Sequence, residues 1–205
     1  MRKINIYVEG VADAKFIQDL ILEWYQIEMI FDKSGKYGEP NILITDGKTN
    51  LDKFKPLFKL NSDKDILSIV IFDADIFNEE NDKFVELKKE FSVECFLLPD
   101  NHSNGDLEIL LSQIINQDNK VIFNCWEGYE NCLKDSFRKE GVFTTPARKT
   151  KIYAYLEALL GESNSEKDLI KERERDCQNK NHWDLNAPAL VKLKQFLDQY
   201  FQKLS

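Results

Sequence analysis

Two short apolar runs that each end in carboxylates constrain the fold of this chain more than any other feature. Residues 4–8 form the first run and are followed at once by Glu9, Gly10 and a helical pattern. Residues 66–72 form the second run, which stops at Asp73. Runs of this length, rich in β-branched and aromatic residues and followed by turn residues, predict buried strands. The sequence therefore predicts two strands whose carboxyl ends carry acidic side chains.

The residues just after these strands predict a site. Gly10 permits a tight turn, so Glu9 is expected at a strand end beside the start of a helix. In an extended chain residues two apart point the same way, so Asp73 and Asp75 are expected to face one point beyond the second strand. Like charges roughly 4 Å apart repel by about 4 kcal/mol at an intermediate dielectric. Either one carboxyl keeps a proton or a cation binds, and hard ions such as Mg²⁺ prefer oxygen ligands. The alternative is that these aspartates only form turns or caps.

The pattern of strand and helix recurs twice more. Residues 42–44 and 93–98 predict two further strands, with helical spacing between the strands. Four strands alternating with helices predict an α/β fold with a mainly parallel four-stranded sheet flanked by helices. Ligands of such sheets bind beyond the carboxyl ends of the strands, where Glu9, Asp73 and Asp75 fall.

Three residues near these ends are candidates for supporting roles. Asp13 lies where a helix cap is expected, and capping and support of the site both stay open for it. Asp106 is expected to cap a helix or to be its first-turn acid, a position that the helix dipole favours. Gly47 follows the strand at residues 42–44, and its backbone N–H is a candidate to bind phosphate, with a plain turn as the alternative.

Composition limits what the chain can do. Its 205 residues are 42% hydrophobic and 31% charged, which suffices for one sizeable core with a helical annex. We expect an α/β domain over residues 1–118 and a helical extension over residues 119–205, packed together as one compact unit. The net charge of −8 argues against a broad basic surface that coats nucleic acid, though not against a local basic groove.

Cysteine usage and targeting signals bear on the compartment. The four cysteines show no Cys-x-x-Cys pairing and the two histidines are isolated, so a zinc site is not expected. Reduced thiols are typical of a cytoplasmic protein. We recognise no signal peptide, lipidation signal or membrane-spanning run, so no membrane partner is expected.

The last part of the chain is predicted to be helical. Aromatic side chains within residues 123–137 are expected in the core rather than as a platform for stacking bases. Residues 162–180 are highly charged, which predicts a solvated helix or loop. From Pro188 on, the sequence predicts an amphipathic helix whose apolar face packs on the fold or on a partner, so an oligomer stays open. A loop is predicted over residues 34–38 and a helix stop at Gly161.

The order of the acidic motifs resembles the TOPRIM domain, which topoisomerases, bacterial primases, small recombination nucleases and OLD-family (overcoming lysogenization defect) nucleases share. The resemblance covers roughly residues 3–115. It rests on an apolar strand with Glu9-Gly10-x-x-Asp13 and a second apolar strand with Asp73-x-Asp75. Further marks are similar to small stand-alone TOPRIM-like proteins related to the OLD nucleases: Leu98-Pro99-Asp100, Gly105-Asp106-Leu107-Glu108, Lys149-x-Lys151-Ile152-Tyr153-Ala154, Trp183-Asp184-Leu185 and Leu193-Lys194-Gln195-Phe196-Leu197.

The resemblance implies a TOPRIM-like, Rossmann-like fold and a metal-dependent nuclease that acts on DNA or RNA. Mg²⁺ or Mn²⁺ would be held by Asp73 and Asp75, with Glu9 as a further ligand or as the general acid/base. Glu108 would complete a second metal position. From spacing alone, Glu108 is an ordinary first-turn acid.

The resemblance also implies a lysine that steadies the scissile phosphate. Lys149 and Lys151 both match, and the sequence does not choose between them. Basic residues at a helix start oppose the helix dipole, which favours a further reason for their presence. The alternative is that both lysines are ordinary solvated side chains.

Departures from these relatives put the substrate and the activity of the isolated chain in doubt. The sequence shows no P-loop, no zinc-binding set and no room for a separate tyrosine-bearing domain. Activity is therefore expected to depend on a partner, such as a separately encoded ATPase. The alternative is a non-catalytic module that binds nucleic acid, a nucleotide or a protein on a TOPRIM-like scaffold.

Overall fold

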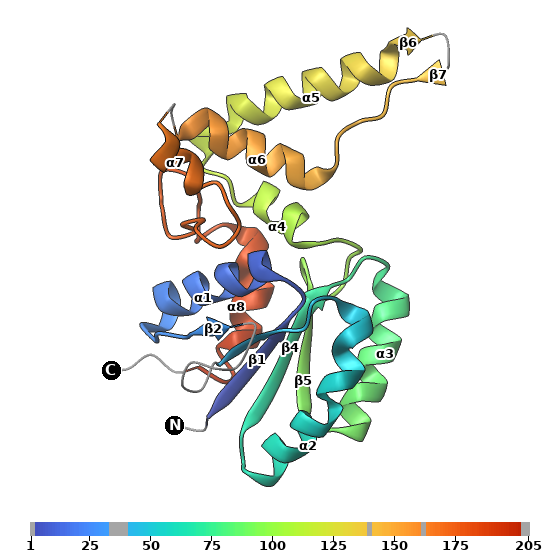
Figure 1. Ribbon diagram of the computed structural model, residues 1–205, viewed down its shortest axis with the longest axis vertical. Helices are drawn as coiled ribbons and strands as arrows, with labels where there is room; N and C mark the ends of the chain where they lie inside the picture. Colours follow the sequence, from blue (N-terminus) through green and yellow to red (C-terminus); the bar gives the residue numbers. More distant parts are fainter. Residues whose placement is uncertain (1–2, 33–40, 139–140, 161–162, 202–205) are drawn as a thin grey trace.

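A parallel five-stranded sheet lies at the centre of the computed structural model, which describes residues 3–32, 41–138, 141–160 and 163–201. The strand order is β2-β3-β1-β4-β5 (Figure 1). The strands are β1 (Ile4–Val8), β2 (Phe31–Asp32), β3 (Ile42–Ile44), β4 (Leu67–Asp73) and β5 (Val93–Leu98). The predicted α/β class with a mainly parallel sheet is confirmed, and all four expected strands pair in parallel. The edge strand β2 is an addition, because two residues show no periodicity from which to predict a strand.

Helices cover both faces of the sheet, because successive side chains of a strand point to opposite faces. Ile6 and Ile69 belong to a buried cluster with residues of α1 (Val11–Tyr25) and α8 (Val191–Leu197). Tyr7 and Val70 belong to a second cluster with residues of α2 (Lys55–Asp63) and α3 (Phe77–Glu90). Parallel strands buried on both faces in this way read as the nearly continuous apolar runs seen in the sequence.

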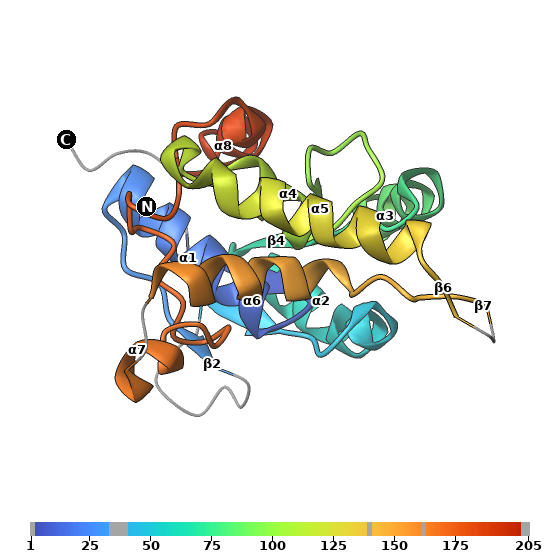
Figure 2. The ribbon, with the colours of Figure 1, turned by 90° about the horizontal axis from the view of Figure 1, so that it is seen from above.

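The remaining helices stand beyond the carboxyl ends of the strands (Figure 1). α5 and α6 lie side by side, and the ribbon of β6 and β7 projects from the far end of α5 (Figure 2). The remaining helices and strands are η1 (Lys48–Phe54), α4 (Leu107–Gln113), η2 (Gln117–Asn119), α5 (Lys120–Asp135), β6 (Phe137–Arg138), β7 (Gly141–Val142), α6 (Arg148–Leu159), α7 (Asn164–Asp168) and η3 (Pro188–Leu190). The division of the chain at residue 118 stays a prediction.

Two expectations for the helical part hold only in part. Phe123 is buried in the core as expected, but other aromatic residues of this stretch are not. Phe137 is 80% exposed, because it starts the projecting ribbon, and Tyr129 is 48% exposed. The charged stretch is not simply solvated, since α7 is followed by an irregular segment in which Arg175 and Cys177 are buried. The amphipathic C-terminal helix is confirmed as η3 and α8, which pack on the sheet.

The loop predicted over residues 34–38 and the helix stop predicted at Gly161 lie outside the described residues. In the described part of the chain, none of the helices combines the length and the apolar character that crossing a membrane requires.

Candidate carboxylate site

Glu9 and Asp73 are joined at the carboxyl ends of the neighbouring strands β1 and β4. The backbone N–H of Asp73 donates to Oε1 of Glu9 at 2.9 Å. The N–H of Leu107, the first residue of α4, donates to Oδ1 of Asp73 at 2.9 Å. Within the described residues, the second oxygen of each carboxylate accepts no hydrogen bond. The parallel register therefore brings together two acids that lie 64 residues apart in the sequence, and leaves each with one oxygen for a ligand.

Asp13 lies beside this pair in the first turn of α1. Its Oδ2 accepts a 2.9 Å hydrogen bond from the N–H of Gly10, and the side chain is buried. The capping role considered for Asp13 is thus observed, and Gly10 provides the turn that the sequence predicts. Asp13 also influences the site, because its negative charge contributes to the raised pKa of Asp73.

Burial and mutual repulsion hold protons on this cluster. Burial, followed by the charges of Asp13 and Glu9, raises the pKa of Asp73 to about 8. Burial, with the charges of Glu9 and Glu108, raises the pKa of Asp13 to about 7. Burial also raises the pKa of Glu9, and the charge of Lys48 and the bond from Asp73 act against it. Without a bound cation, part of the cluster is therefore protonated at neutral pH.

Asp75 does not follow the predicted geometry. β4 ends at Asp73, and Asp75 has a left-handed backbone with φ of 42°, so the chain between them is not extended. The side chain of Asp75 is 67% exposed and its Oδ2 pairs with Lys48 Nζ at 2.6 Å. The two aspartates therefore have different partners, Leu107 for the side chain of Asp73 and Lys48 for that of Asp75. The expectation that the two aspartates point the same way is wrong.

Lys48 is a site residue that the sequence analysis missed. Its Nζ lies 2.6 Å from Asp75 Oδ2 and 3.7 Å from Glu9 Oε1. Burial disfavours its charged form, but the hydrogen bond to Asp75 and the charges of Glu9 and Asp75 outweigh this and raise the pKa of Lys48. The one available signal was that Lys48 follows Gly47 in the turn after β3, at the same edge of the sheet as Glu9.

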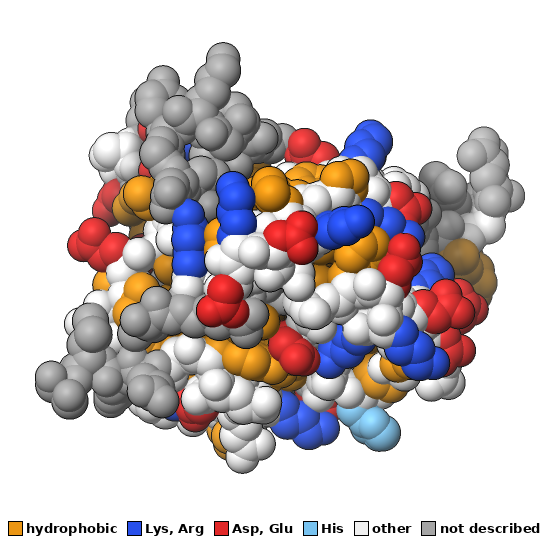
Figure 3. Space-filling view, turned by 90° about the horizontal axis from the view of Figure 1, so that it is seen from below, with side chains coloured by type: hydrophobic (Ala, Val, Ile, Leu, Met, Phe, Trp, Pro, Cys, Tyr) orange, Lys and Arg blue, Asp and Glu red, His pale blue; other side chains and the backbone are white. Residues whose placement is uncertain are grey.

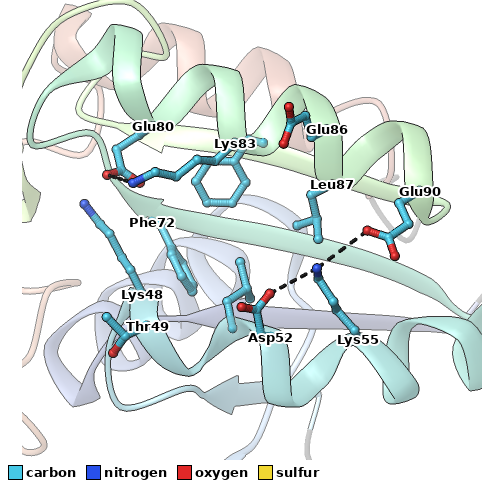
Figure 4. Close-up of a pocket in the computed structure, with 12 residues that line it drawn as sticks. Lys48, Thr49, Asp52, Lys55, Phe72, Glu80, Lys83, Glu86, Leu87 and Glu90 are labelled. Carbon is cyan, nitrogen blue, oxygen red and sulfur yellow. Dashed lines mark hydrogen bonds and ion pairs between the residues drawn. The ribbon is translucent and has the colours of Figure 1, made fainter.

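A pocket of about 360 Å³ opens beside Lys48, between η1 and α2 on one side and α3 on the other (Figure 4). Phe72 and Leu87 are among its apolar lining. Its other lysines are engaged in ion pairs, Lys83 with Glu80 and Lys55 with Asp52 and Glu90. The pocket is therefore a neutralised groove rather than a cationic one.

Asp106 and Glu108 lie where α4 begins. Asp106 caps α4, because its Oδ1 accepts from the N–H of Ile109 at 2.8 Å, and its Oδ2 pairs with Arg148. Burial raises the pKa of Glu108, as does the charge of Asp106, while the charge of Arg175 lowers it. The predicted cap is confirmed, and Glu108 stands at the edge of the cluster, where its charge reaches Asp13.

Within the described residues, neither Lys149 nor Lys151 forms an ion pair with the carboxylate cluster of Glu9, Asp13 and Asp73. Lys151 Nζ lies 3.6 Å from Glu127 Oε1 and 4.3 Å from the centre of the Phe123 ring, so it packs against α5. Lys149 is exposed on the first turn of α6. The basic residue of this turn that reaches the cluster is Arg148, through Asp106. The phosphate-binding role expected of Lys149 or Lys151 stays a prediction.

Gly47 has a structural role, and its N–H is already used in a hydrogen bond. Its φ of 106° favours glycine, and its N–H donates to the carbonyl of Glu9 at 3.2 Å. That hydrogen bond uses the group expected to bind phosphate. Gly47 thus links the end of β3 to the end of β1 and places Lys48 over Glu9.

The described residues contain no group of three or more histidine, cysteine, aspartate or glutamate side chains placed to hold a metal ion. The chemistry of the donors nevertheless fits a hard cation, because burial and neighbouring acids raise the pKa values of Asp13 and Asp73, and a bound cation would favour their charged forms. Residues that could hold such an ion are Glu9 and Asp73, with Asp75 and Glu108 at the margins. Lys48 now occupies the side of Glu9 that faces Asp75.

The visible surface charge is mixed in sign. Figure 3 shows acidic and basic side chains interspersed over the face opposite the α5–α6 layer, with no continuous basic patch among the coloured residues. This agrees with the net charge of −8. Any attraction for an anion on this face has to come from individual cations.

Comparison with known families covers nearly the whole chain. The model of a family described as "Protein of unknown function (DUF3226)" matches residues 3–202. No curated protein and no solved structure matches the chain.

Proposed function

The chain belongs to the DUF3226 family, whose function is unknown, and we propose from its site that it is a metal-dependent enzyme acting on phosphodiesters, most simply a TOPRIM-type nuclease for DNA or RNA. One observation carries the proposal. Glu9 and Asp73 lie at the ends of adjacent parallel strands, each anchored through one oxygen to a backbone N–H and each with a second oxygen that accepts no hydrogen bond in the described residues. Ligands of parallel sheets bind at this edge.

A divalent ion is the cofactor that suits these residues. Mg²⁺ or Mn²⁺ would be held by Glu9 and Asp73, joined by Asp75 after Lys48 leaves it, and Glu108 is a candidate for a second position. A bound ion of this kind supplies charge stabilisation of a phosphate and lowers the pKa of bound water. The raised pKa of Asp73 supports the proposal, because a proton now takes the place of a cation there.

The chain's own residues have separable tasks in the proposed reaction. The backbone bonds from Asp73 and Leu107 fix the positions of the two carboxylates. Glu9 is suited to carry a proton, because burial raises its pKa above its ordinary value. Lys48 stands next to Glu9 and can neutralise a phosphate oxygen once it parts from Asp75.

The proposal also includes a cytoplasmic location and a partner protein. The four cysteines are free thiols, which agrees with a cytoplasmic protein. The net charge of −8 favours a partner that delivers nucleic acid, such as a separately encoded ATPase.

The test is cleavage of single- and double-stranded DNA and RNA with Mg²⁺ or Mn²⁺ by the wild-type chain and by Asp73→Asn. The matched control is Asp100→Asn, because Asp100 follows β5 but accepts its hydrogen bond from the N–H of Ser103, at 2.7 Å. We expect metal-dependent cleavage by the wild type and the control, and its loss in Asp73→Asn. Cleavage that survives in Asp73→Asn contradicts the assigned site.

A second candidate function is a non-catalytic binding module. The observation in its favour is Lys48, which already supplies a cation to Glu9 and Asp75, so part of the cluster is balanced without a metal. Under this alternative, EDTA leaves the melting temperature and the partner affinity unchanged. If the protein is a metal-dependent enzyme, EDTA should lower the melting temperature, because a bound ion stabilises the folded state by mass action.

A further inference from the structure

Arg175 is the one buried arginine or lysine among the described residues, at 5% exposure. It lies in the irregular segment between α7 and η3, which runs back from α7 toward α1 and α8 (Figure 1). Long segments without helix or strand are uncommon in compact domains and are usually functional. A buried cation on such a segment therefore requires an explanation.

The guanidinium of Arg175 has few polar contacts. No ion pair joins it to a carboxylate within the described residues, and its buried Nε has no hydrogen-bond partner. Its side chain lies against the ring of Tyr153, whose centre is 5.7 Å from Cζ. Burying a charge without a partner is strongly unfavourable, so the site is incomplete without an anion.

The surroundings of Arg175 lie next to the carboxylate cluster. Its charge acts on Glu108, whose own charge acts on Asp13. Tyr153 is turned toward another acid, since its hydroxyl donates to Glu172 Oε1 at 3.1 Å. The guanidinium thus stands at the α4 end of the acidic cluster, and Lys48 stands at the opposite end, beside Asp75.

We propose that Arg175 is an anion-binding residue, and that its anion is a phosphate group of the substrate. Five donors in a planar fork match two phosphate oxygens at once, which a lysine cannot do. Lys151 and Lys149 do not compete for this role, because one packs on α5 and the other is exposed. That the phosphate belongs to a phosphodiester rests on the proposed function, whereas the anion site rests on Arg175 alone.

The experiment measures the binding of inorganic phosphate to the full chain in EDTA, through its melting temperature and by calorimetry. The variants are Arg175→Met and Arg175→Lys. Arg173→Met is the matched control, because Arg173 lies two residues away but is exposed over the ring of Phe31. Working without metal separates this inference from the proposed nuclease.

We expect phosphate to raise the melting temperature of the wild type and of Arg173→Met. Arg175→Met should lose phosphate affinity by about tenfold or more, the value of charge-assisted hydrogen bonds. Without phosphate it should melt at a higher temperature than the wild type, because an unpaired buried charge is gone. Arg175→Lys should bind phosphate more weakly than the wild type, and it serves as the test if Arg175→Met fails to fold.

Two results overturn the inference. The first is a wild type whose melting temperature and calorimetric signal do not respond to phosphate. The second is an Arg175→Met or Arg175→Lys variant that binds phosphate as the wild type does, which would make Arg175 a packing residue. Phosphate binding that depends on Arg175 in a chain that binds no metal would support the anion site and count against the nuclease.

Discussion

Oε1 of Glu9 accepts a 2.9 Å hydrogen bond from the backbone N–H of Asp73, so the end of β1 is tied to the end of β4 through an acidic side chain. This hydrogen bond holds the side chain of Glu9 where its negative charge acts on both Asp73 and Asp13. Burial, together with the charges of Asp13 and Glu9, raises the pKa of Asp73 to about 8, which makes the site measurable through pH.

Replacing Asp73 should change how stability depends on pH. Its pKa rises from 3.8 to about 8 on folding, so between these values the folded state binds more protons than the unfolded state. The unfolding free energy of the metal-free wild type therefore loses a contribution as the pH rises through this range. Asp73→Asn does not titrate, and its amide oxygen can still accept from Leu107. We expect the variant to gain stability relative to the wild type up to about pH 8, measured by denaturant unfolding. A difference that stays constant with pH contradicts the proton on Asp73.

Lys48→Gln tests whether this lysine occupies a cation position. Without Lys48, Asp75 and Glu9 lose their counter-charge, which should lower the stability of the metal-free protein by up to about 1 kcal/mol. The affinity for Mn²⁺ should rise, because the lysine no longer competes for the carboxylates. Lys55→Gln is the control, since Lys55 pairs with Asp52 and Glu90 away from the cluster. An affinity for Mn²⁺ that falls in Lys48→Gln would show that the lysine assists the metal instead of replacing it.

Much of this arrangement was predictable from the sequence, for a physical reason. Buried parallel strands are continuous apolar runs, and a residue that follows such a run must lie at the ligand-binding edge of the sheet. That logic placed Glu9 and Asp73. It failed for Asp75, because the direction of a side chain beyond the strand depends on a left-handed backbone that no apolar pattern encodes.

The contributions of cations were harder to predict. Lys48 and Arg148 pair with carboxylates from two separate segments, and the charge of Arg175 acts on Glu108 from a third. A long flexible side chain carries no periodic signal of its contacts. Mixed charge made the segment of Arg175 look solvated. Only the packing of that segment shows that one of its charges is buried.

Gly105→Ala should destabilise the loop that supports Asp75. The carbonyl of Gly105 accepts from the N–H of Asp75 at 2.9 Å, and an added Cβ would lie 2.8 Å from Cδ of Pro99. Such overpacking costs about 1–3 kcal/mol. The control is Gly128→Ala in α5, where a Cβ meets nothing within 4 Å and should add about 0.5–1 kcal/mol of stability. Thermal unfolding of both variants checks the contrast, and equal effects would contradict the tight approach at Gly105.

Removing the cap of α4 should separate two roles of Asp106. Asp106→Ala loses the bond from Ile109, which typically costs about 1 kcal/mol. Asp106→Asn keeps a capping oxygen and should cost less, and both variants give up the pair with Arg148. That pair is largely exposed on the arginine side and contributes little. Denaturant unfolding should therefore show a larger loss for Asp106→Ala, and equal losses would place the main role of Asp106 in the ion pair.

Metal binding tests the central claim most directly. Calorimetric titration of Mn²⁺ into the metal-free protein at pH 8, where the carboxylates lose their protons most readily, should show a saturable site in the wild type and in Asp100→Asn. Asp73→Asn should bind Mn²⁺ far more weakly, because it lacks the carboxylate between Glu9 and α4. A wild type that binds no Mn²⁺, or an Asp73→Asn variant that binds it equally well, would contradict a metal site at Glu9 and Asp73.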